Sequence, residues 1–225
     1  MNIIYRDRNL IVVEKPPGMA SQQERGLDMD AVSWIRIHLH TDYVGVVHRL
    51  DKPVGGVMVY ALDPQSAARL SEQVRARQVS KTYEAAVYGQ PAQSGGTLED
   101  MLLEDRRSNV TKVAAAGTPK ARRAVLSYET EAVLRREEQC WTLLRIHLLT
   151  GRRHQIRVQL AHAGFGIAGD RKYSPEAPLL PGYRGLALYA SELEFAHPVS
   201  GERMKFSARP EFADIFRRDG GPGEA

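Results

Sequence analysis

Short apolar runs separated by polar turns dominate the chain, whereas segments with a helical period are few. The first two runs, residues 3–5 and 10–13, flank a polar turn and predict two short strands. Residues 57–62 are almost continuously apolar, which is typical of a buried strand. Five further strands are predicted at residues 81–88, 124–129, 141–149, 187–194 and 204–208.

Three helices are predicted, at residues 28–40, 64–78 and 152–162. For the first helix, either Asp28 or Asp30 could be the N-terminal cap. For the second, Asp63 can accept the first amide hydrogens, and Pro64 fits the first helical position because its missing N–H would have no partner there.

These elements predict the α+β class, with a mixed, largely antiparallel sheet and flanking helices, because consecutive strands are joined by short turns. The polar stretch 91–120 is expected to form an excursion such as a hairpin arm. No internal repeat or interdomain linker is evident. We therefore expect one domain over residues 1–212, followed by a tail over residues 213–225 whose end is disordered.

Composition excludes several classes of protein. The 225 residues are 43% hydrophobic, which is enough for a sizeable core, and the single cysteine, Cys140, excludes an intrachain disulfide and a site with several cysteines. The N-terminus does not resemble a signal peptide, and no apolar stretch approaches the roughly 18 residues of a membrane span. The seven histidines match no zinc motif. We expect a soluble, cytoplasmic protein without a metal.

The net charge of +4 and the isoelectric point of about 9.2 permit nucleic-acid binding without establishing it. Basic residues cluster at three places, although a solvated surface would explain any one cluster. The clusters contain Arg106 and Arg107; Lys120, Arg122 and Arg123; and Arg152, Arg153 and Arg157.

A glycine pattern at residues 164–169 has the spacing G-x-G-x-x-G that is found in dinucleotide-binding proteins. It follows a predicted helix instead of a strand, and no clear helix begins after it. Gly164 is better interpreted as the residue that ends the preceding helix.

Three segments carry candidate chemistry. The β-branched run 44–47 leads into His48-Arg49-Leu50-Asp51, and a turn with Gly55 and Gly56 follows, where a ligand could approach the backbone closely. The second segment is Lys81-Thr-Tyr83. The third is residues 150–160, in which Arg157 is predicted to share a helix face with both Arg153 and His154. The arginines of this segment suit a phosphate or a carboxylate. Taken alone, Asp51 is more often a turn residue or an ion-pair partner.

In this combination and order, the chain resembles the RluA-type family of RNA pseudouridine synthases. The matching segments span residues 3 to about 208. They are Ile11-Val-Val-Glu-Lys15-Pro-Pro-Gly18, His48-Arg-Leu-Asp51, Lys81-Thr-Tyr83, Thr150 to His162, and Gly169-Asp-Arg-Lys-Tyr173. The resemblance implies the family's catalytic fold, in a short form without the small N-terminal RNA-binding module of some relatives.

The resemblance also implies roles for individual residues. Asp51 corresponds to the catalytic aspartate, Tyr83 to a tyrosine that packs on the target base, and Arg157 to an arginine that pairs with the aspartate. Arg49 corresponds to a residue inserted into the RNA stack when the uridine flips out. RNA contacts are expected from His48, Arg49, Lys120, Arg122, Arg123, Arg152, Arg153 and His154.

The implied reaction isomerises uridines in ribosomal or transfer RNA without a cofactor. We expect RNA as the partner, no membrane, no obligate protein partner, and a monomer. Because the N-terminal module is expected to be missing, the catalytic domain and the excursion at residues 91–123 would recognise the RNA. Two other functions are left open: an RNA-binding or RNA-folding protein with little activity, and a hydrolase that uses Asp51 on a nucleoside or sugar.

Three departures from the family pattern are visible. Val54-Gly55-Gly56 replaces the common Thr-Ser-Gly after the aspartate, which removes two hydroxyl groups and keeps the last glycine. Arg157-Val-Gln159 replaces R-V-H. Finally, the usual L-x-L-H-A is Leu186-Ala-Leu-Tyr189-Ala.

Overall fold

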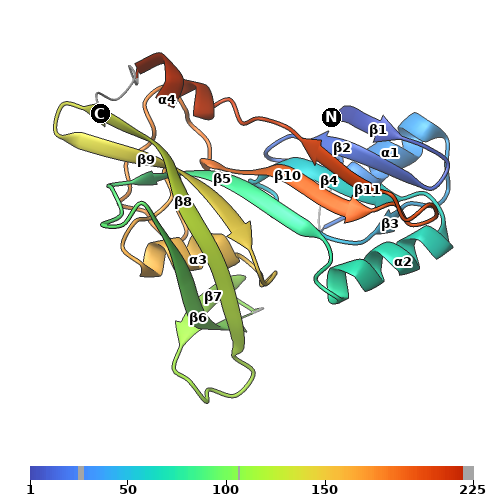
Figure 1. Ribbon diagram of the computed structural model, residues 1–225, viewed down its shortest axis with the longest axis horizontal. Helices are drawn as coiled ribbons and strands as arrows, with labels where there is room; N and C mark the ends of the chain where they lie inside the picture. The colour runs from blue at the N-terminus through green and yellow to red at the C-terminus, as the bar shows by residue number, and fades with distance from the viewer. Residues whose placement is uncertain (25–27, 106, 220–225) are drawn as a thin grey trace. The chain divides into compact units, whose positions relative to one another are not determined.

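The computed structural model describes residues 1–24, 28–105 and 107–219, which fall into two compact units (Figure 1). The first unit contains Met1–Thr82 and Tyr189–Pro210, and the second contains Tyr83–Leu188 and the residues from Glu211 onward. Each unit has its own strands and helices. That residues 1–212 act as a single domain stays a prediction.

The first unit is built on a mixed sheet in the order β1, β2, β4, β10. Neighbouring strands are antiparallel except β4 and β10, which are parallel; β11 pairs with β10, and β3 pairs with β4, both antiparallel. The strands are β1 (Asn2–Arg6), β2 (Leu10–Lys15), β3 (Gly45–Val46), β4 (Gly55–Ala61), β10 (Leu188–Ala196) and β11 (Arg203–Ser207). The predicted strand at residues 57–62 is confirmed as β4, which is buried along its whole length.

Two helices belong to this unit, α1 (Ala31–Leu39) and α2 (Pro64–Arg75). Helix α2 contributes the buried side chain of Leu70 to a core formed with apolar residues of β2, β4 and β10. Both helix starts follow the predicted capping chemistry. The Asp30 carboxylate accepts hydrogen bonds from two backbone N–H groups of α1, and Asp63 accepts one from Ser66 N–H in α2. Asp28, the alternative cap, forms an ion pair with Lys52 at 2.8 Å instead.

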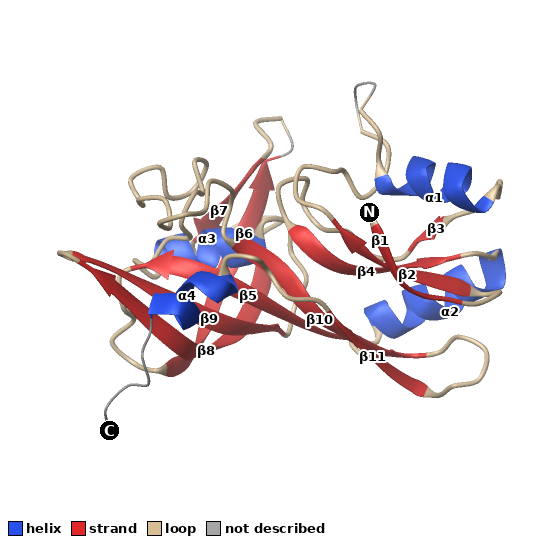
Figure 2. Cartoon of the chain, turned by 90° about the horizontal axis from the view of Figure 1, so that it is seen from above, coloured by secondary structure: helices blue, strands red, loops and turns tan. Residues whose placement is uncertain are grey.

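The second unit is built on strands in the order β5, β9, β8, β6, β7 (Figure 2). They are β5 (Ser80–Tyr88), β6 (Gly95–Asp105), β7 (Val110–Ala114), β8 (Arg122–Arg136) and β9 (Gln139–Leu148). The first three residues of β5 lie in the first unit. The pairs β6–β7, β6–β8 and β8–β9 are antiparallel. Strands β6 and β7 form the hairpin that the polar stretch 91–120 predicted.

Helix α3 (Gln155–His162) packs against β6 and β7, and α4 (Ala213–Asp219) packs against β8. Helix α3 begins three residues later than predicted, because His154 has a φ of 53° in the left-handed region. Arg153 therefore precedes the helix, and the predicted helix face shared by Arg153 and Arg157 is wrong. Gly164, with a φ of 87°, follows the end of α3 as expected.

The α+β class with a mixed, largely antiparallel arrangement is confirmed. Helix α4 was not predicted; it lies in the segment expected to be a tail. The expected disorder at the C-terminus concerns residues 220–225, which lie outside the described residues. No helix in the described part of the chain is long and apolar enough to cross a membrane.

Candidate active site

Asp51 lies in the first unit, on the turn between β3 and β4, and is partly buried. The residue before it is fixed by a buried hydroxyl: Ser21 Oγ donates to the Leu50 carbonyl oxygen at 2.7 Å and accepts from Leu50 N–H at 3.0 Å. Tyr60 Oη in turn donates to the Ser21 carbonyl oxygen at 2.9 Å. Val54 N–H donates to the Asp51 carbonyl oxygen at 2.9 Å and closes the turn.

Gly56 holds the far side of this turn. It has a φ of 128°, and a Cβ atom there would lie 2.2 Å from the Ala190 carbonyl oxygen and 2.6 Å from its nitrogen. No side chain fits at that separation, so only glycine lets β4 approach β10 this closely. The glycine of the motif therefore anchors the aspartate turn to the neighbouring strand.

A buried lysine lies within electrostatic reach of the carboxylate. Lys15 is fully buried, and its Nζ donates to the carbonyl oxygens of Pro16 at 3.1 Å and Met19 at 2.7 Å. Burial lowers the pKa of Lys15 to about 8, and the attraction of Asp51 partly opposes this lowering. At neutral pH the ammonium group is charged and contributes a positive potential at Asp51.

His48 is a buried residue of the first unit. Its Nε2 accepts a hydrogen bond from Val59 N–H at 3.2 Å. Burial, together with the charge of Lys81, lowers the pKa of His48 well below its ordinary value, so the ring is neutral. Arg49, the next residue, is exposed. Contacts of His48 and Arg49 with RNA stay predictions; the observed role of His48 is to hold the segment against β4.

Arg157 lies in the second unit and is paired there with Asp170. Its Nε and Nη2 donate to the two Asp170 carboxylate oxygens at 2.7 and 2.6 Å, and the side chains are 8% and 1% exposed. Asp170 Oδ1 also accepts from the backbone N–H groups of Lys172 and Tyr173. Asp51 belongs to the first unit, so its expected pairing with Arg157 stays a prediction.

Tyr173 joins three parts of the second unit. Its Oη lies 2.6 Å from His154 Nδ1, at the start of α3, and accepts a hydrogen bond from Thr111 N–H on β7 at 3.0 Å. The Arg157 guanidinium lies over its ring, 5.0 Å from the centroid. Tyr173 therefore connects the arginine, the beginning of the helix and the hairpin.

Gln155 shapes the turn that precedes α3. Its Oε1 accepts from Thr150 Oγ1 and from Arg152 N–H, both at 2.9 Å. Its Nε2 donates to the Val125 carbonyl oxygen on β8 and to Gln159 Oε1. All four polar positions of this amide are thus used inside the protein, and the segment that carries Arg152 to Arg157 has a defined backbone.

The predicted RNA-contacting cations of the second unit have different surroundings. Arg123 forms two hydrogen bonds with Glu99, at 2.5 and 2.7 Å, and Arg152 Nε donates to the Arg123 carbonyl oxygen. Arg153 pairs with Glu104 at 3.1 Å and also donates to Asn109. Lys120 and Arg122 are exposed. Phosphate would compete with a carboxylate at Arg123 and Arg153.

Tyr83 is the first residue of the second unit and is 7% exposed on β5. Its predicted contact with the target base stays a prediction. No group of three or more His, Cys, Asp or Glu side chains within residues 1–24, 28–105 and 107–219 is placed to hold a metal ion.

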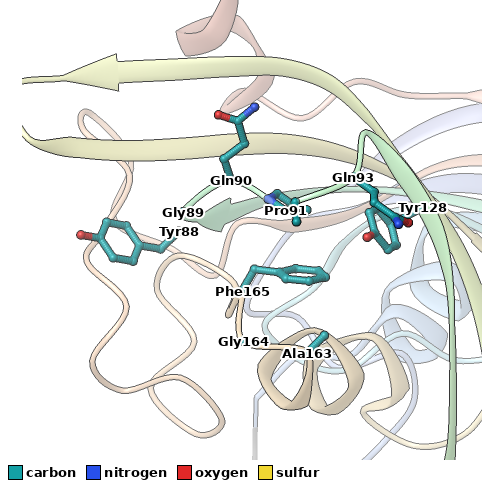
Figure 3. Close-up of a pocket in the computed structure, with 10 residues that line it drawn as sticks. Tyr88, Gly89, Gln90, Pro91, Gln93, Tyr128, Ala163, Gly164 and Phe165 are labelled. Atoms are coloured by element: carbon teal, nitrogen blue, oxygen red, sulfur yellow. The ribbon is translucent and has the colours of Figure 1, made fainter.

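A cavity of about 410 Å³ opens elsewhere in the second unit (Figure 3). The rings of Tyr128 and Phe165 belong to its wall, with centroids 5.5 Å apart. None of the residues predicted from the sequence as site residues lines it. Its lining consists of Tyr88, Gly89, Gln90, Pro91, Ala92, Gln93, Tyr128, Ala163, Gly164 and Phe165.

Sequence reasoning gave no role to Ser21, Gln155, Asp170 or Tyr173. Asp170 and Tyr173 lie in a segment that carried the resemblance, which was a signal that they have a function. Ser21 and Gln155 act through contacts with distant backbone groups. Nothing in their own sequence neighbourhoods indicates those contacts.

Comparison with known proteins gives consistent matches. Residues 9–162 match the family described as RNA pseudouridylate synthase. The chain is 36% identical over 224 residues to a ribosomal large subunit pseudouridine synthase D from Xanthomonas campestris, covering 92% of this chain and 65% of that protein. It is 32% identical over 213 residues to the dual-specificity RNA pseudouridine synthase RluA of Yersinia pestis, covering 94% of this chain and all of that protein.

The fold has the same relatives. The solved structure of human RNA pseudouridylate synthase domain containing 4 superposes with a TM-score of 0.78 at 26% sequence identity, covering 97% of this chain and 92% of that one. The chain thus spans about two thirds of the length of the first relative above and the full length of the second.

Proposed function

Because the chain belongs to the RNA pseudouridylate synthase family, we propose that it isomerises specific uridines of structured RNA to pseudouridine, with Asp51 as the catalytic carboxylate. A relative named for the ribosomal large subunit supports ribosomal RNA as the substrate. Transfer RNA is the alternative that the family resemblance implies. The protein is proposed to act as a monomer in the cytoplasm.

The reaction is an isomerisation, and its atoms balance without a cofactor. The bond between ribose C1′ and uracil N1 breaks, the base turns, and a bond forms between C1′ and C5. The hydrogen on C5 leaves as a proton, and N1 gains a proton. An ionised carboxylate can attack C1′ or stabilise the positive charge that develops there.

The observation that carries the proposal is the preorganisation of Asp51. The aspartate follows Leu50, whose N–H and C=O are both bound by the buried Ser21 hydroxyl. Its turn is closed by Val54 and followed by Gly56 at the contact with β10. Such a frame fixes the backbone that carries the carboxylate before substrate binds, and electrostatic catalysis requires preorganised groups.

The other site residues are assigned by the family resemblance. Tyr83 forms the wall on which the detached base packs, so that the base turns without leaving. Arg157 provides a positive charge near the reacting groups, and its bond to Asp170 fixes the direction of the guanidinium. Arg49 fills the space left in the RNA stack when the uridine flips out.

RNA binding is proposed to rest on the β6–β7 hairpin and the basic residues near it. Lys120 and Arg122 are exposed there, and Arg152 and His154 lie at the turn before α3. Sequence-specific RNA recognition mostly targets loops and unstacked bases, so contacts to phosphates and to the loop shape would select the site.

The experiment uses RNA labelled with tritium at C5 of uridine and isolated from a strain that lacks the gene. Because isomerisation removes the C5 hydrogen, purified protein is expected to release tritium into water, and Asp51→Asn is expected to release none. The variant is nearly isosteric, so its circular dichroism and RNA affinity should match wild type, and this comparison is the control.

Two other results would each favour one of the functions left open by the sequence. Binding of RNA without tritium release by the wild-type protein would identify an RNA-binding or RNA-folding protein. Release of free uracil would identify a hydrolase. Either result contradicts the proposed isomerisation.

A further inference from the structure

Two departures from the family pattern, Gly55 and Tyr189, meet in the structure. They are directly paired between the parallel strands β4 and β10. A Cβ atom at residue 55 would lie 2.9 Å from Tyr189 Cε2 and 2.9 Å from Pro17 Cδ. The family pattern that the chain resembles has a serine at the first position and a histidine at the second. The tyrosine ring occupies the space into which a serine side chain would extend.

Tyr189 cannot easily move away from Gly55. Its side chain is buried, with 7% exposure, and its Oη donates to Glu14 Oε1 at 2.5 Å. Glu14 lies on β2, opposite Val57 of β4, so this bond ties the ring to the strand on the other side of β4. The ring is therefore held at its polar end as well as by packing.

Pro17, the other close neighbour, lies on the loop after β2 and is exposed. That loop is coupled to the catalytic turn, because Gly18 N–H donates to the carbonyl oxygen of Lys52 at 2.8 Å. Lys52 is the residue after Asp51. A larger side chain at residue 55 would thus displace the exposed neighbour, the Pro17 loop, and through Lys52 it would shift the aspartate.

We propose that Tyr189 is a positioning residue for Asp51, and that Gly55 and Tyr189 form a matched pair that replaces the serine and histidine of relatives. The ring of Tyr189 packs beside Gly55 and sets the place of the Pro17 loop. Glu14 sets the orientation of the ring. This inference rests on the proposed function, since the quantity that the pair controls is the placement of the catalytic carboxylate.

The test is a double-mutant cycle of wild type, Gly55→Ser, Tyr189→His and the double variant. The measurement is the single-turnover rate of tritium release from C5-labelled RNA with enzyme in saturating excess. Each single variant is expected to lose about tenfold or more in rate, because displacements of an ångström at a catalytic group can cost about a hundredfold. The double variant is expected to recover to within about threefold of wild type, since the shorter imidazole leaves room for the serine.

Tyr189→Phe is the matched control, because it keeps the ring and loses only the bond to Glu14. Its rate is expected to fall less than that of Tyr189→His. Thermal unfolding of every variant separates positioning from stability: a purely structural role would lower the melting temperature and leave the rate of the folded enzyme unchanged. If Gly55→Ser does not fold at the assay temperature, Gly55→Ala takes its place under the same criteria.

Two results would overturn the inference, and they are distinguishable from failure of the proposed function. If wild type is active and the losses of the two single variants simply add in the double variant, the pair is not matched. If wild type is active and the single variants keep its rate, Tyr189 does not position Asp51. If wild type itself releases no tritium, the proposed function fails, and the positioning role falls with it.

Discussion

Arg157 and Asp170 form a buried ion pair in which both guanidinium contacts are short. Asp170→Asn keeps the shape of the side chain and removes the charge that the buried Arg157 guanidinium contacts through two hydrogen bonds. The expected loss in free energy of unfolding is about 3 kcal/mol, because the buried guanidinium loses the charge of its bidentate partner. Urea unfolding monitored by circular dichroism measures it.

Glu99→Gln is the matched control for this prediction. It removes the charge that pairs with Arg123 in an exposed setting, with side chains 53% and 59% exposed. Water already screens this pair, so the expected loss is much smaller than that of Asp170→Asn. Equal losses in the two variants would contradict the special role assigned to the Arg157–Asp170 pair.

Lys81 gives a pH-dependent prediction, because burial lowers its pKa from 10.5 to about 8. Between these values the unfolded chain binds more protons than the folded one, so this lysine makes wild type more stable as the pH rises from 8 to 10.5. Lys81→Met removes the buried charge. It should be more stable than wild type at pH 7, by on the order of 3 kcal/mol, since the pKa falls from 10.5 to about 8 and one pKa unit corresponds to about 1.4 kcal/mol.

This difference between Lys81→Met and wild type should shrink as the pH rises toward 10. Thermal unfolding at pH 7, 8, 9 and 10 measures it, and Lys112→Met, at an exposed position of β7, controls for the loss of one positive charge. If the stability difference between Lys81→Met and wild type stays constant over this pH range, the buried charge of Lys81 does not destabilise the protein.

At the residue scale, the sequence predicts which side chains carry chemistry but not how they are held. Asp51, Tyr83 and Arg157 stand out because their motifs are compact and ordered along the chain. Ser21 and Gln155 do not, because their partners Leu50 and Val125 lie about thirty residues away in the sequence. Local pattern contains no information about such contacts.

The β6–β7 hairpin is attached to the rest of the second unit by polar side chains. Tyr173 Oη accepts from Thr111 N–H, and Lys172 Nζ donates to the Asn109 carbonyl oxygen at 2.7 Å. Tyr173→Phe leaves the Thr111 N–H without its acceptor. Amide hydrogen exchange in β7 is therefore expected to be about fivefold faster, which corresponds to the roughly 1 kcal/mol of one hydrogen bond.

Tyr43→Phe is the control for this prediction, since Tyr43 lies in the first unit and is 36% exposed. It should leave the exchange of β7 unchanged. Unaltered exchange in Tyr173→Phe as well would mean that the hydroxyl does not hold the hairpin.

Elements were predictable where their ends carry local signals. The caps Asp30 and Asp63 mark the starts of α1 and α2, and both act as expected. Helix α3 begins later than predicted because His154 adopts a left-handed conformation, which side-chain periodicity does not reveal. Strand β8 extends to Arg136, beyond the predicted residue 129, because its pairing with β9 continues past the apolar stretch.

At the scale of the whole molecule, the proposed RNA binding is expected to weaken with salt, because basic side chains that contact phosphates release counterions from the RNA. Arg122 and Arg123 differ in availability: Arg122 is exposed on β8, whereas Arg123 is engaged by Glu99. If Arg122 contacts a phosphate, Arg122→Ala should lower the slope of log affinity against log salt by about 0.7 to 0.9.

Arg123→Ala should change this slope less, because Arg123 must first give up its carboxylate partner. Both slopes are measured by filter binding, from about 50 to 200 mM salt. The RNA is a stem–loop transcript that contains the target uridine. A larger change for Arg123 than for Arg122 would contradict the proposed difference between the two arginines.

The α+β class could be predicted from the sequence, because consecutive short strands joined by short turns, together with few helices, are typical of this class. The division into two units did not. The chain returns to the first unit at Tyr189 after forming most of the second, and this return leaves no mark in composition. Helix α4 was missed for a related reason: it forms where the chain comes back to pack on β8.

The central claim, that this protein makes pseudouridine through Asp51, is tested most directly by carbodiimide mapping of pseudouridine in total RNA. The RNA comes from a strain lacking the gene and from the same strain complemented with wild type or with Asp51→Asn. We expect one or a few sites to vanish on deletion and to return only with wild type. Sites that return equally with Asp51→Asn, or a map that deletion does not change, would contradict the claim.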